Sequence, residues 1–245
     1  MVLNTTISKN HLHTIGMGEL SDMACFYNWG GRQDGLRVDG NLCHNVSSYC
    51  YGGWGFYTDQ TSEAVHITNN TVYDTVDACF HDHDGAGITV ANNVLVKQKA
   101  PAQSLGPLCN AHDDGAIRGA APNPSLNWTE SFGLQGNIVY TANGAGVFTD
   151  YASTTDFKGS TFDRNVYYNN ARAVRFPGNQ DFASWQRKGA GRSGGGEDAN
   201  SLVANPQFVD GASNDFTLKP SSPAYKLGFV PIDNSDVGPR RVHAD

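Results

Sequence analysis

This chain of 245 residues is poor in charged residues and has no long apolar run. Lys, Arg, Asp and Glu together make up 17% of it, and the net charge is −7. No basic cluster occurs apart from Arg240-Arg241, so nucleic acid is not an expected partner. No apolar stretch approaches the roughly 20 residues that span a bilayer, and no signal peptide is recognisable. We therefore expect no membrane segment.

Cysteine is also scarce, and an odd number of cysteines cannot pair completely within one chain. Their spacings match no metal motif, so we expect small buried side chains with one disulfide at most. The five cysteines are Cys25, Cys43, Cys50, Cys79 and Cys109. Glycosylation sequons at Asn4, Asn45, Asn69 and Asn127 are compatible with secretion.

What the chain does contain is glycine, with 28 residues, and a recurring phrase of the form apolar-x-x-Asn-x-apolar-x. Abundant glycine with few charges favours many short strands joined by tight turns. The phrase occurs six times, with steps of 31, 29, 23, 44 and 28 residues between its asparagines. These asparagines are Asn10, Asn41, Asn70, Asn93, Asn137 and Asn165.

A period of this length predicts an all-β fold, specifically a right-handed parallel β-helix in which each period is one coil. The asparagine would sit at a bend, where it tolerates the left-handed backbone region, and stacked copies would form a hydrogen-bonded ladder. The flanking apolar residues would point inward. A sandwich or a propeller would instead show other periods and hairpin turns.

The repeat predicts one domain over residues 1–245, with coils in 1–170. The largest loop is expected at 97–129. Residues 171–201 form an excursion that contains a short helix at Phe182–Lys188, and residues 202–245 form a C-terminal cap, which a repeat array needs. No matching cap precedes the first coil, so we expect the protein to be truncated at its N-terminus.

Counting back from each asparagine aligns the residues between the phrases. Tyr27, Tyr57 and Phe80 fall at equivalent places, 14, 13 and 13 residues before the next asparagine, and are expected to stack. Asp59 lies 11 before its asparagine, and His81 and His83 lie 12 and 10 before theirs. These three side chains should share one corner, about 4.8 Å apart along the axis.

Strand alternation would place His81 and His83 on one face and Asp82 on the other. Asp22 belongs to the preceding coil.

Two carboxylates on adjacent coils suit glycoside hydrolysis, because one must protonate the leaving oxygen and the other must activate water or attack the sugar. Trp54, Tyr27 and Tyr57 can offer ring faces to sugars. The plainer alternative is that Asp22 and Asp59 only cap turns.

His81 and His83 could bind a metal together with Asp59, but the sequence offers no third ligand of known geometry, and holding a carboxylate or a sugar hydroxyl suits the pair better. We expect no cofactor, with calcium or another divalent metal as the alternative.

These residues resemble a known family. Leu20-Ser21-Asp22-Met23, the block from Gly52 to Asp59 and Phe80-His81-Asp82-His83 are similar to the core of β-helix proteins of glycoside hydrolase family 141. The ending from Asn205 to Phe229 is similar to the usual C-terminus of that family. The resemblance covers nearly the whole chain, as the C-terminal portion of a longer protein.

The resemblance implies α-L-fucosidase-like or xylanase-like activity. It implies Asp22 and Asp59 as the catalytic pair, with His81 and His83 lining the same groove and Arg118 contributing to substrate binding. The family usually has Glu where this chain has Gln60, and Gln where it has Asp82. The replacement of Glu by Gln60 removes one carboxylate, and Asp82 restores one on an adjacent coil.

The sequence thus favours a secreted enzyme that hydrolyses glycosidic bonds in a plant or algal polysaccharide or oligosaccharide. One alternative is a polysaccharide lyase with His83 or Tyr57 as general base, although no cluster of basic residues supports it. Another is a non-catalytic protein that binds glycans.

Overall fold

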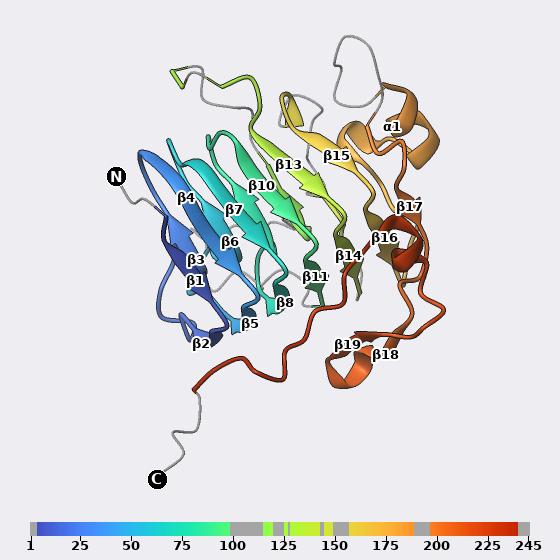
Figure 1. Cartoon of the computed structure of the whole chain (residues 1–245), viewed down its shortest axis with the longest axis horizontal. Helices are drawn as coiled ribbons and strands as arrows, with labels where there is room; N and C mark the ends of the chain where they lie inside the picture. The colour runs from blue at the N-terminus through green and yellow to red at the C-terminus, as the bar shows by residue number, and fades with distance from the viewer. Residues whose placement is uncertain are drawn as a thin grey trace.

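The computed structural model describes residues 4–98, 115–119, 125–126, 128–142, 145–148, 157–188 and 197–239. These residues form three parallel sheets and one antiparallel hairpin (Figure 1). The expected all-β architecture with parallel sheets is confirmed. Up to residue 141 each parallel sheet takes every third strand, so three consecutive strands, which we call a repeat, contribute one strand to each sheet.

In spatial order, the first sheet contains β1 (Thr6–Ser8), β4 (Arg32–Asp39), β7 (Glu63–Thr68), β10 (Ile88–Ala91), β13 (Phe132–Gln135) and β15 (Thr161–Asp163). The second contains β17 (Leu202–Val203), β16 (Val166–Asn169), β14 (Ile138–Thr141), β11 (Val94–Lys97), β8 (Thr71–Thr75), β5 (Leu42–Val46) and β2 (His11–Ile15). The third contains β12 (Ile117–Arg118), β9 (Phe80–Asp82), β6 (Gly53–Thr58) and β3 (Met23–Asn28).

Two rows of apolar side chains run through the repeats, one on each side of the recurring asparagine. The first sheet pairs Val38 with Ile67, and the second pairs Cys43 with Val72. All four side chains are buried in one continuous core. Each such burial contributes roughly 1.5–3 kcal/mol relative to exposure, so the rows are a main source of stability. The expectation that these residues point inward is confirmed.

The asparagines form the expected ladder. The backbone N–H of Asn41 donates to Oδ1 of Asn70 at 2.8 Å, and that of Asn70 donates to Oδ1 of Asn93 at 2.9 Å. The side-chain amide of Asn70 donates to the same oxygen of Asn93 and, at 2.9 Å, to the carbonyl of Val38. Each amide thus satisfies buried backbone groups on both sides of it.

The ladder asparagines are not themselves the left-handed residues of the bend, which corrects the expectation. Positive φ occurs one residue earlier, for example at Lys9 (57°), Gly40 (65°) and Asn69 (57°). The preceding residue therefore makes the turn, and the asparagine directs its N–H toward the next repeat.

The expected short helix, α1 (Phe182–Lys188), lies within the segment that covers the last strands of the first and second sheets. Together with η2 (Pro177–Asn179) it brings Trp185 against Phe162 and Phe176, with ring centroids 5.4 and 5.7 Å away. Trp185 is fully buried. This segment closes the end of the core.

Asp198 ends the asparagine ladder. Its carboxylate accepts hydrogen bonds from Trp185 Nε1 at 2.8 Å, from the Tyr167 hydroxyl and from the Asn165 amide. The Asn165 N–H donates to Ser201 Oγ at 2.8 Å, where another asparagine would otherwise stand. Burial raises the pKa of Asp198 to about 6, against the effect of these bonds.

The C-terminal segment covers the side of the second sheet rather than its end. The hairpin of β18 (Phe208–Asp210), η3 (Gly211–Ser213) and β19 (Asp215–Leu218) is followed by η4 (Pro223–Leu227). Phe216 and Leu218 form a cluster with the outward side chains Val94, Val96 and Ile138. The expected cap therefore lies along a flank, and the preceding segment covers the end.

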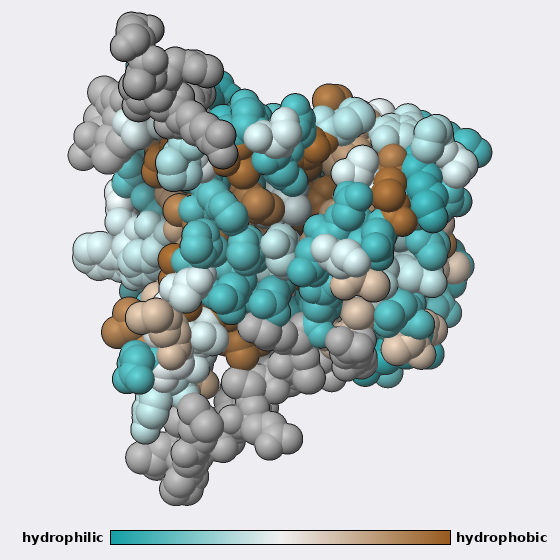
Figure 2. All heavy atoms as spheres, turned by 90° about the horizontal axis from the view of Figure 1, so that it is seen from below, coloured by the Kyte–Doolittle hydropathy of each residue, from teal (hydrophilic) through white to brown (hydrophobic). Residues whose placement is uncertain are grey.

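The last described residues run back toward the first repeat, as the red ribbon in Figure 1 shows. Val230 N–H donates to Asn92 Oδ1 at 2.8 Å, and Gly238 N–H donates to the Lys9 carbonyl at 2.9 Å. Lys9 also forms a 2.8 Å ion pair with Asp236. Seen from below, this part of the surface is mostly hydrophilic, with apolar residues showing between the polar ones (Figure 2).

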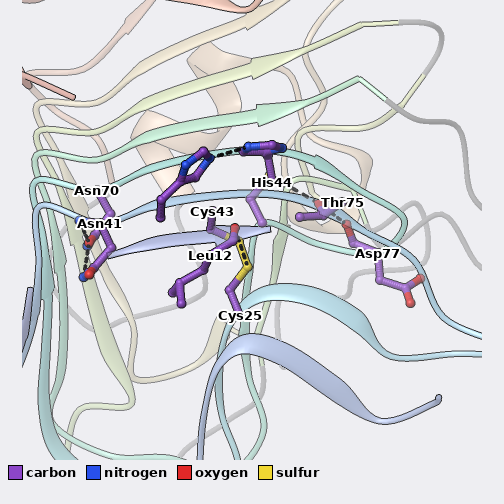
Figure 3. The surroundings of a disulfide bond; sticks show 10 residues. Leu12, Cys25, Asn41, Cys43, His44, Asn70, Thr75 and Asp77 are labelled. Carbon is purple, nitrogen blue, oxygen red and sulfur yellow. Dashed lines mark hydrogen bonds between the residues drawn. A yellow bond between two sulfur atoms is a disulfide. The ribbon is translucent and has the colours of Figure 1, made fainter. Parts of the chain in front are cut away.

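The cysteines pair more than expected. Cys25 of β3 and Cys43 of β5 form a disulfide between the third and second sheets (Figure 3). Cys50 is disulfide-bonded as well, so the expectation of one disulfide at most is wrong. Cys79 is a buried free thiol, and burial raises its pKa to about 11. Cys109 lies outside the described residues.

Most of the expected loop at 97–129 also lies outside the described residues. In the part that is described, no helix is both long enough and apolar enough to cross a membrane.

We expect Asn93→Ala to lower the free energy of unfolding by about 3 kcal/mol, because it leaves several buried backbone and amide groups unpaired. Urea unfolding followed by circular dichroism measures this. The matched control is Asn45→Gly, at an exposed position with a φ of 56° that glycine adopts freely. Equal unfolding free energies for the two variants would contradict the stabilising role of the ladder.

Candidate functional site

The site residues project from the third sheet, in which successive residues face the core and the outside in turn. Phe56 pairs with Phe80 and faces the core, whereas Tyr57 pairs with His81 and faces outward. Tyr27 pairs with Tyr57 in the same outward row, and Arg118 pairs with His81. The expected stack of Tyr27, Tyr57 and Phe80 is therefore off by one residue in its third member, which is His81.

Asp22 lies just before β3, against the bend that opens β6. Its φ of 57° is left-handed, a conformation that aspartate adopts more readily than most residues. The Asp22 N–H donates to the Tyr51 carbonyl at 3.0 Å. A Cβ on Gly52 would come within 2.6 Å of the Asp22 backbone, and Gly52 itself has a φ of 79°. Only glycine allows the two bends to approach this closely.

A buried lysine and a buried aspartate hold the start of β6. Lys97 is fully buried and donates from Nζ to the three carbonyls of residues 75–77, at 2.5–3.0 Å. The carboxylate of Asp77 accepts from the N–H groups of Gly52 and Gly53 at 2.7 and 2.8 Å. Each buried charge is thus hydrogen-bonded, as burial requires.

Asp59 follows β6 and is surrounded by hydrogen-bond donors. Tyr27 donates from its hydroxyl to Oδ2 at 2.7 Å, and the Gln60 N–H donates to Oδ1 at 2.7 Å. His83 Nδ1 lies 2.9 Å from Oδ1, and the Tyr57 hydroxyl also bonds the carboxylate. The expected meeting of Asp59 and His83 is confirmed by this contact.

The pKa values of the two candidate carboxyls are shifted in opposite directions from their usual value. Partial desolvation raises the pKa of Asp22, although the residue is still exposed to solvent, and the nearby Asp59 charge raises it further. Burial also acts to raise the pKa of Asp59, but the bonds from Tyr27, Gln60, Tyr57 and His83 outweigh it and hold the pKa below its usual range. Asp59 is therefore the more readily ionised of the two.

The aromatic residues form a wall rather than an open platform. Trp54 lies 4.4 Å from Tyr57 and 4.7 Å from His81, measured between ring centroids. All three are nearly buried, and burial holds the pKa of His81 well below its usual range, with Arg118 and His83 adding to the shift. Tyr27, by contrast, is 46% exposed and offers a free ring surface.

Most of these residues line a pocket of about 300 Å³, but Tyr27 is not part of its lining. Its lining contains most of the site residues that the sequence predicts. It also contains Tyr51 and Gln60, which the sequence does not predict. Tyr51 bonds the Asp22 side chain. Its sequence signal is its position directly before the Gly52-Gly53 bend. The lining residues are Asp22, Tyr51, Trp54, Tyr57, Asp59, Gln60, His81, His83 and Arg118.

Asp82 does not belong to this pocket, which corrects its assignment to substrate binding. It lies on the opposite face of β9, fully buried, where it accepts hydrogen bonds from Thr58 and Ser131 at 2.7 Å. Burial raises its pKa to about 6. Because side chains alternate between the two faces of the strand, as expected, Asp82 points away from the pocket that His81 and His83 line. Asp82 therefore cannot replace the negative charge that Gln60 lacks.

A larger cavity of about 580 Å³ lies between the second sheet and the C-terminal segment. It contains none of the sequence-predicted site residues. We place the candidate site in the smaller pocket because, of these two cavities, it is the one that brings two carboxyls, two imidazoles and a guanidinium together. In the described part of the chain, no group of three or more metal-ligating side chains is arranged to hold a metal ion.

Comparison of the chain with protein-family models, with curated proteins and with solved structures found no match in any of the three. The resemblance to glycoside hydrolase family 141 therefore remains a prediction, and the site has to be interpreted from its own geometry.

We expect Tyr27→Phe to raise the pKa of Asp59, because it removes the 2.7 Å hydrogen bond that favours the carboxylate. A lowered pKa stabilises the fold above the unfolded-state pKa, near 4, and that contribution is lost as pH falls through the folded-state value. Tyr27→Phe should therefore reduce stability at neutral pH more than at low pH.

The measurement is a carboxyl-carbon NMR titration of Asp59, with Tyr49→Phe at an exposed position as the matched control. An unchanged pKa of Asp59 in Tyr27→Phe would contradict the assigned hydrogen bond.

Proposed function

We propose that this protein is a secreted glycoside hydrolase on a right-handed parallel β-helix, with Asp22 and Asp59 as its catalytic carboxyls. The observation that carries the proposal is that two carboxyls share one pocket and have pKa values displaced in opposite directions. Such a pair supplies one proton donor and one carboxylate at the same pH, which glycoside hydrolysis requires.

Asp22 is the general acid in this mechanism. Its raised pKa keeps a proton available, and the bond to Tyr51 orients its carboxyl group in the pocket. In the first step Asp22 gives this proton to the glycosidic oxygen as the bond to the sugar breaks. The departing group therefore leaves as a neutral hydroxyl.

Asp59 is the carboxylate that activates water or attacks the sugar carbon directly. Tyr27, Tyr57 and the Gln60 N–H keep it ionised and fixed, while His83 bridges it to the outer part of the pocket. These four are positioning residues for Asp59. Because four donors match the roughly four lone-pair sites of a carboxylate, one of them has to move aside before Asp59 can accept a proton from water or attack the sugar carbon.

The remaining lining suits a saccharide. Tyr51 in the lining and Tyr27, which bonds Asp59 from outside the lining, are half-exposed rings that can stack on a sugar face. Arg118 can donate to ring hydroxyls or to an acidic substituent. These two exposed rings at the edge of the pocket favour a polysaccharide or oligosaccharide substrate over a single enclosed sugar. The Cys25–Cys43 disulfide and a third disulfide-bonded cysteine, Cys50, support an oxidising compartment and hence secretion.

We expect Asp22→Asn to lose at least about 10²-fold in kcat on substrates with poor leaving groups, the lower end of the usual contribution of general acid–base catalysis. Activity on dinitrophenyl glycosides should be largely retained, because that leaving group needs no proton. Release of reducing sugar and of dinitrophenol measures the two. Equal losses on both substrate types would overturn the general-acid role.

Asp59→Asn should abolish turnover on both substrate types, since it removes the carboxylate that acts at the sugar carbon. The matched control is Asp34→Asn, which removes a carboxylate that pairs only with Arg32 at the surface. Circular dichroism establishes that both variants fold. Full activity of Asp59→Asn would refute the assignment.

A polysaccharide lyase is the second candidate, and one observation favours it: Arg118 lies in the same pocket as His83 and Tyr57. Arginine neutralises the carboxylate of an acidic sugar, and Tyr57 or His83 would then remove the proton beside it. A lyase leaves an unsaturated sugar end that absorbs ultraviolet light, and a hydrolase does not. Binding of a glycan with no product of either kind would support the non-catalytic alternative.

A further inference from the structure

Three histidines gather on the outward face of the second sheet, away from the candidate catalytic pocket. His11 and His13 lie two residues apart on β2, and His44 lies on the neighbouring β5. Their ring centroids are 4.6–5.5 Å apart. Side chains at this spacing on neighbouring parallel strands share one face of the sheet. Three of the eight histidines of the chain are therefore concentrated in one patch.

The closest contact in this patch joins two ring nitrogens. His11 Nε2 lies 2.7 Å from His44 Nε2. His44 follows Cys43 of the disulfide on β5 (Figure 3). One ring must donate and the other accept, so at least one of the two is a neutral imidazole with its lone pair aimed at its neighbour. A metal ion can take the place of the shared proton, because neutral imidazole nitrogen is the ligand that zinc and related ions prefer.

The neighbouring rings hold His44 in place. On one side its ring stacks on His13, at 5.5 Å and an interplanar angle of 12°. The His44 ring also stacks on Tyr73, at 4.7 Å and an interplanar angle of 8°. This contact fixes the plane of His44 from the side opposite His13.

We propose that His11 and His44 form a surface site for a first-row transition metal of the Zn²⁺ type, with His13 as the additional imidazole. In the described residues no three metal-ligating groups already converge on one point. The imidazole rings would therefore have to adjust their positions when the metal binds. With zinc–nitrogen bonds of about 2.0–2.1 Å in a tetrahedral arrangement, the two Nε2 atoms need to separate to about 3.3 Å. A small rotation of the half-exposed rings achieves this, and water completes the coordination.

The location gives such a metal a structural consequence. In the described chain β2 is the edge strand of the second sheet, with β5 as its only partner there. A metal held by His11 and His44 would link the edge strand to the next repeat through side chains, in addition to the backbone hydrogen bonds. Binding to the folded state alone stabilises that state by mass action.

The test is isothermal titration of ZnCl₂ into the untagged, metal-free full chain at pH 7.5, with MgCl₂ as a hard-cation control. We expect one Zn²⁺ per chain with micromolar affinity, a rise in Tm on binding and no Mg²⁺ binding. His11→Gln and His44→Gln should each weaken Zn²⁺ binding at least about tenfold, which corresponds to 1.4 kcal/mol per lost ligand. His13→Gln should weaken it less.

The matched control is His66→Gln, which removes a half-buried histidine of β7 that has no imidazole neighbour among the described residues. It should bind Zn²⁺ as the wild type does. His83→Gln distinguishes this site from the catalytic pocket. Absence of Zn²⁺ binding by the wild type, wild-type affinity in both His11→Gln and His44→Gln, or loss of binding in His83→Gln alone would each overturn the proposal.

Discussion

Buried N–H groups at the bends of this chain need a partner, because no water reaches them. The ladder asparagines supply it: one amide oxygen accepts from both the backbone and the side chain of the asparagine in the preceding repeat. Since that geometry tolerates only the spacing of neighbouring strands, it also fixes how the repeats stack. The candidate site depends on this, because Asp22, Asp59 and His83 come from three successive repeats and meet only if those repeats stay in register.

Within the site, the pKa values of the two carboxyls differ because of the hydrogen bonds that each receives, rather than because of how deeply each is buried. Asp59 receives hydrogen bonds from two tyrosines, a histidine and a backbone N–H, whereas Asp22 has Tyr51 and a left-handed bend. The buried wall of Trp54, Tyr57 and His81 keeps water from one side of both. The unequal number of hydrogen-bond donors therefore makes Asp22 the proton donor and Asp59 the anion.

The repeat period was enough to predict the parallel strands, the inward apolar rows and the asparagine ladder, because each follows from local geometry repeated six times. Register within the third sheet was not predictable to the residue, because no ladder asparagine precedes β3, β6 or β9 directly and loops of different length lead into them. Counting therefore placed Phe80 where His81 stands. The contribution of Tyr51 depends on tertiary contacts that no spacing encodes. Strand alternation did predict Asp82 on the face opposite the histidines, but not its hydrogen bond to the distant Ser131.

The C-terminal segment changes how the array can come apart. In a stack of repeats each unit contacts only its neighbours, so an end unit can fray alone. Here residues near the C-terminus return along the flank to Asn92 and then to Lys9 in the first repeat. Loss of the first repeat would therefore also release a strap that spans several others. The chain should melt more as one cooperative body than as a zipper opening from its exposed edge.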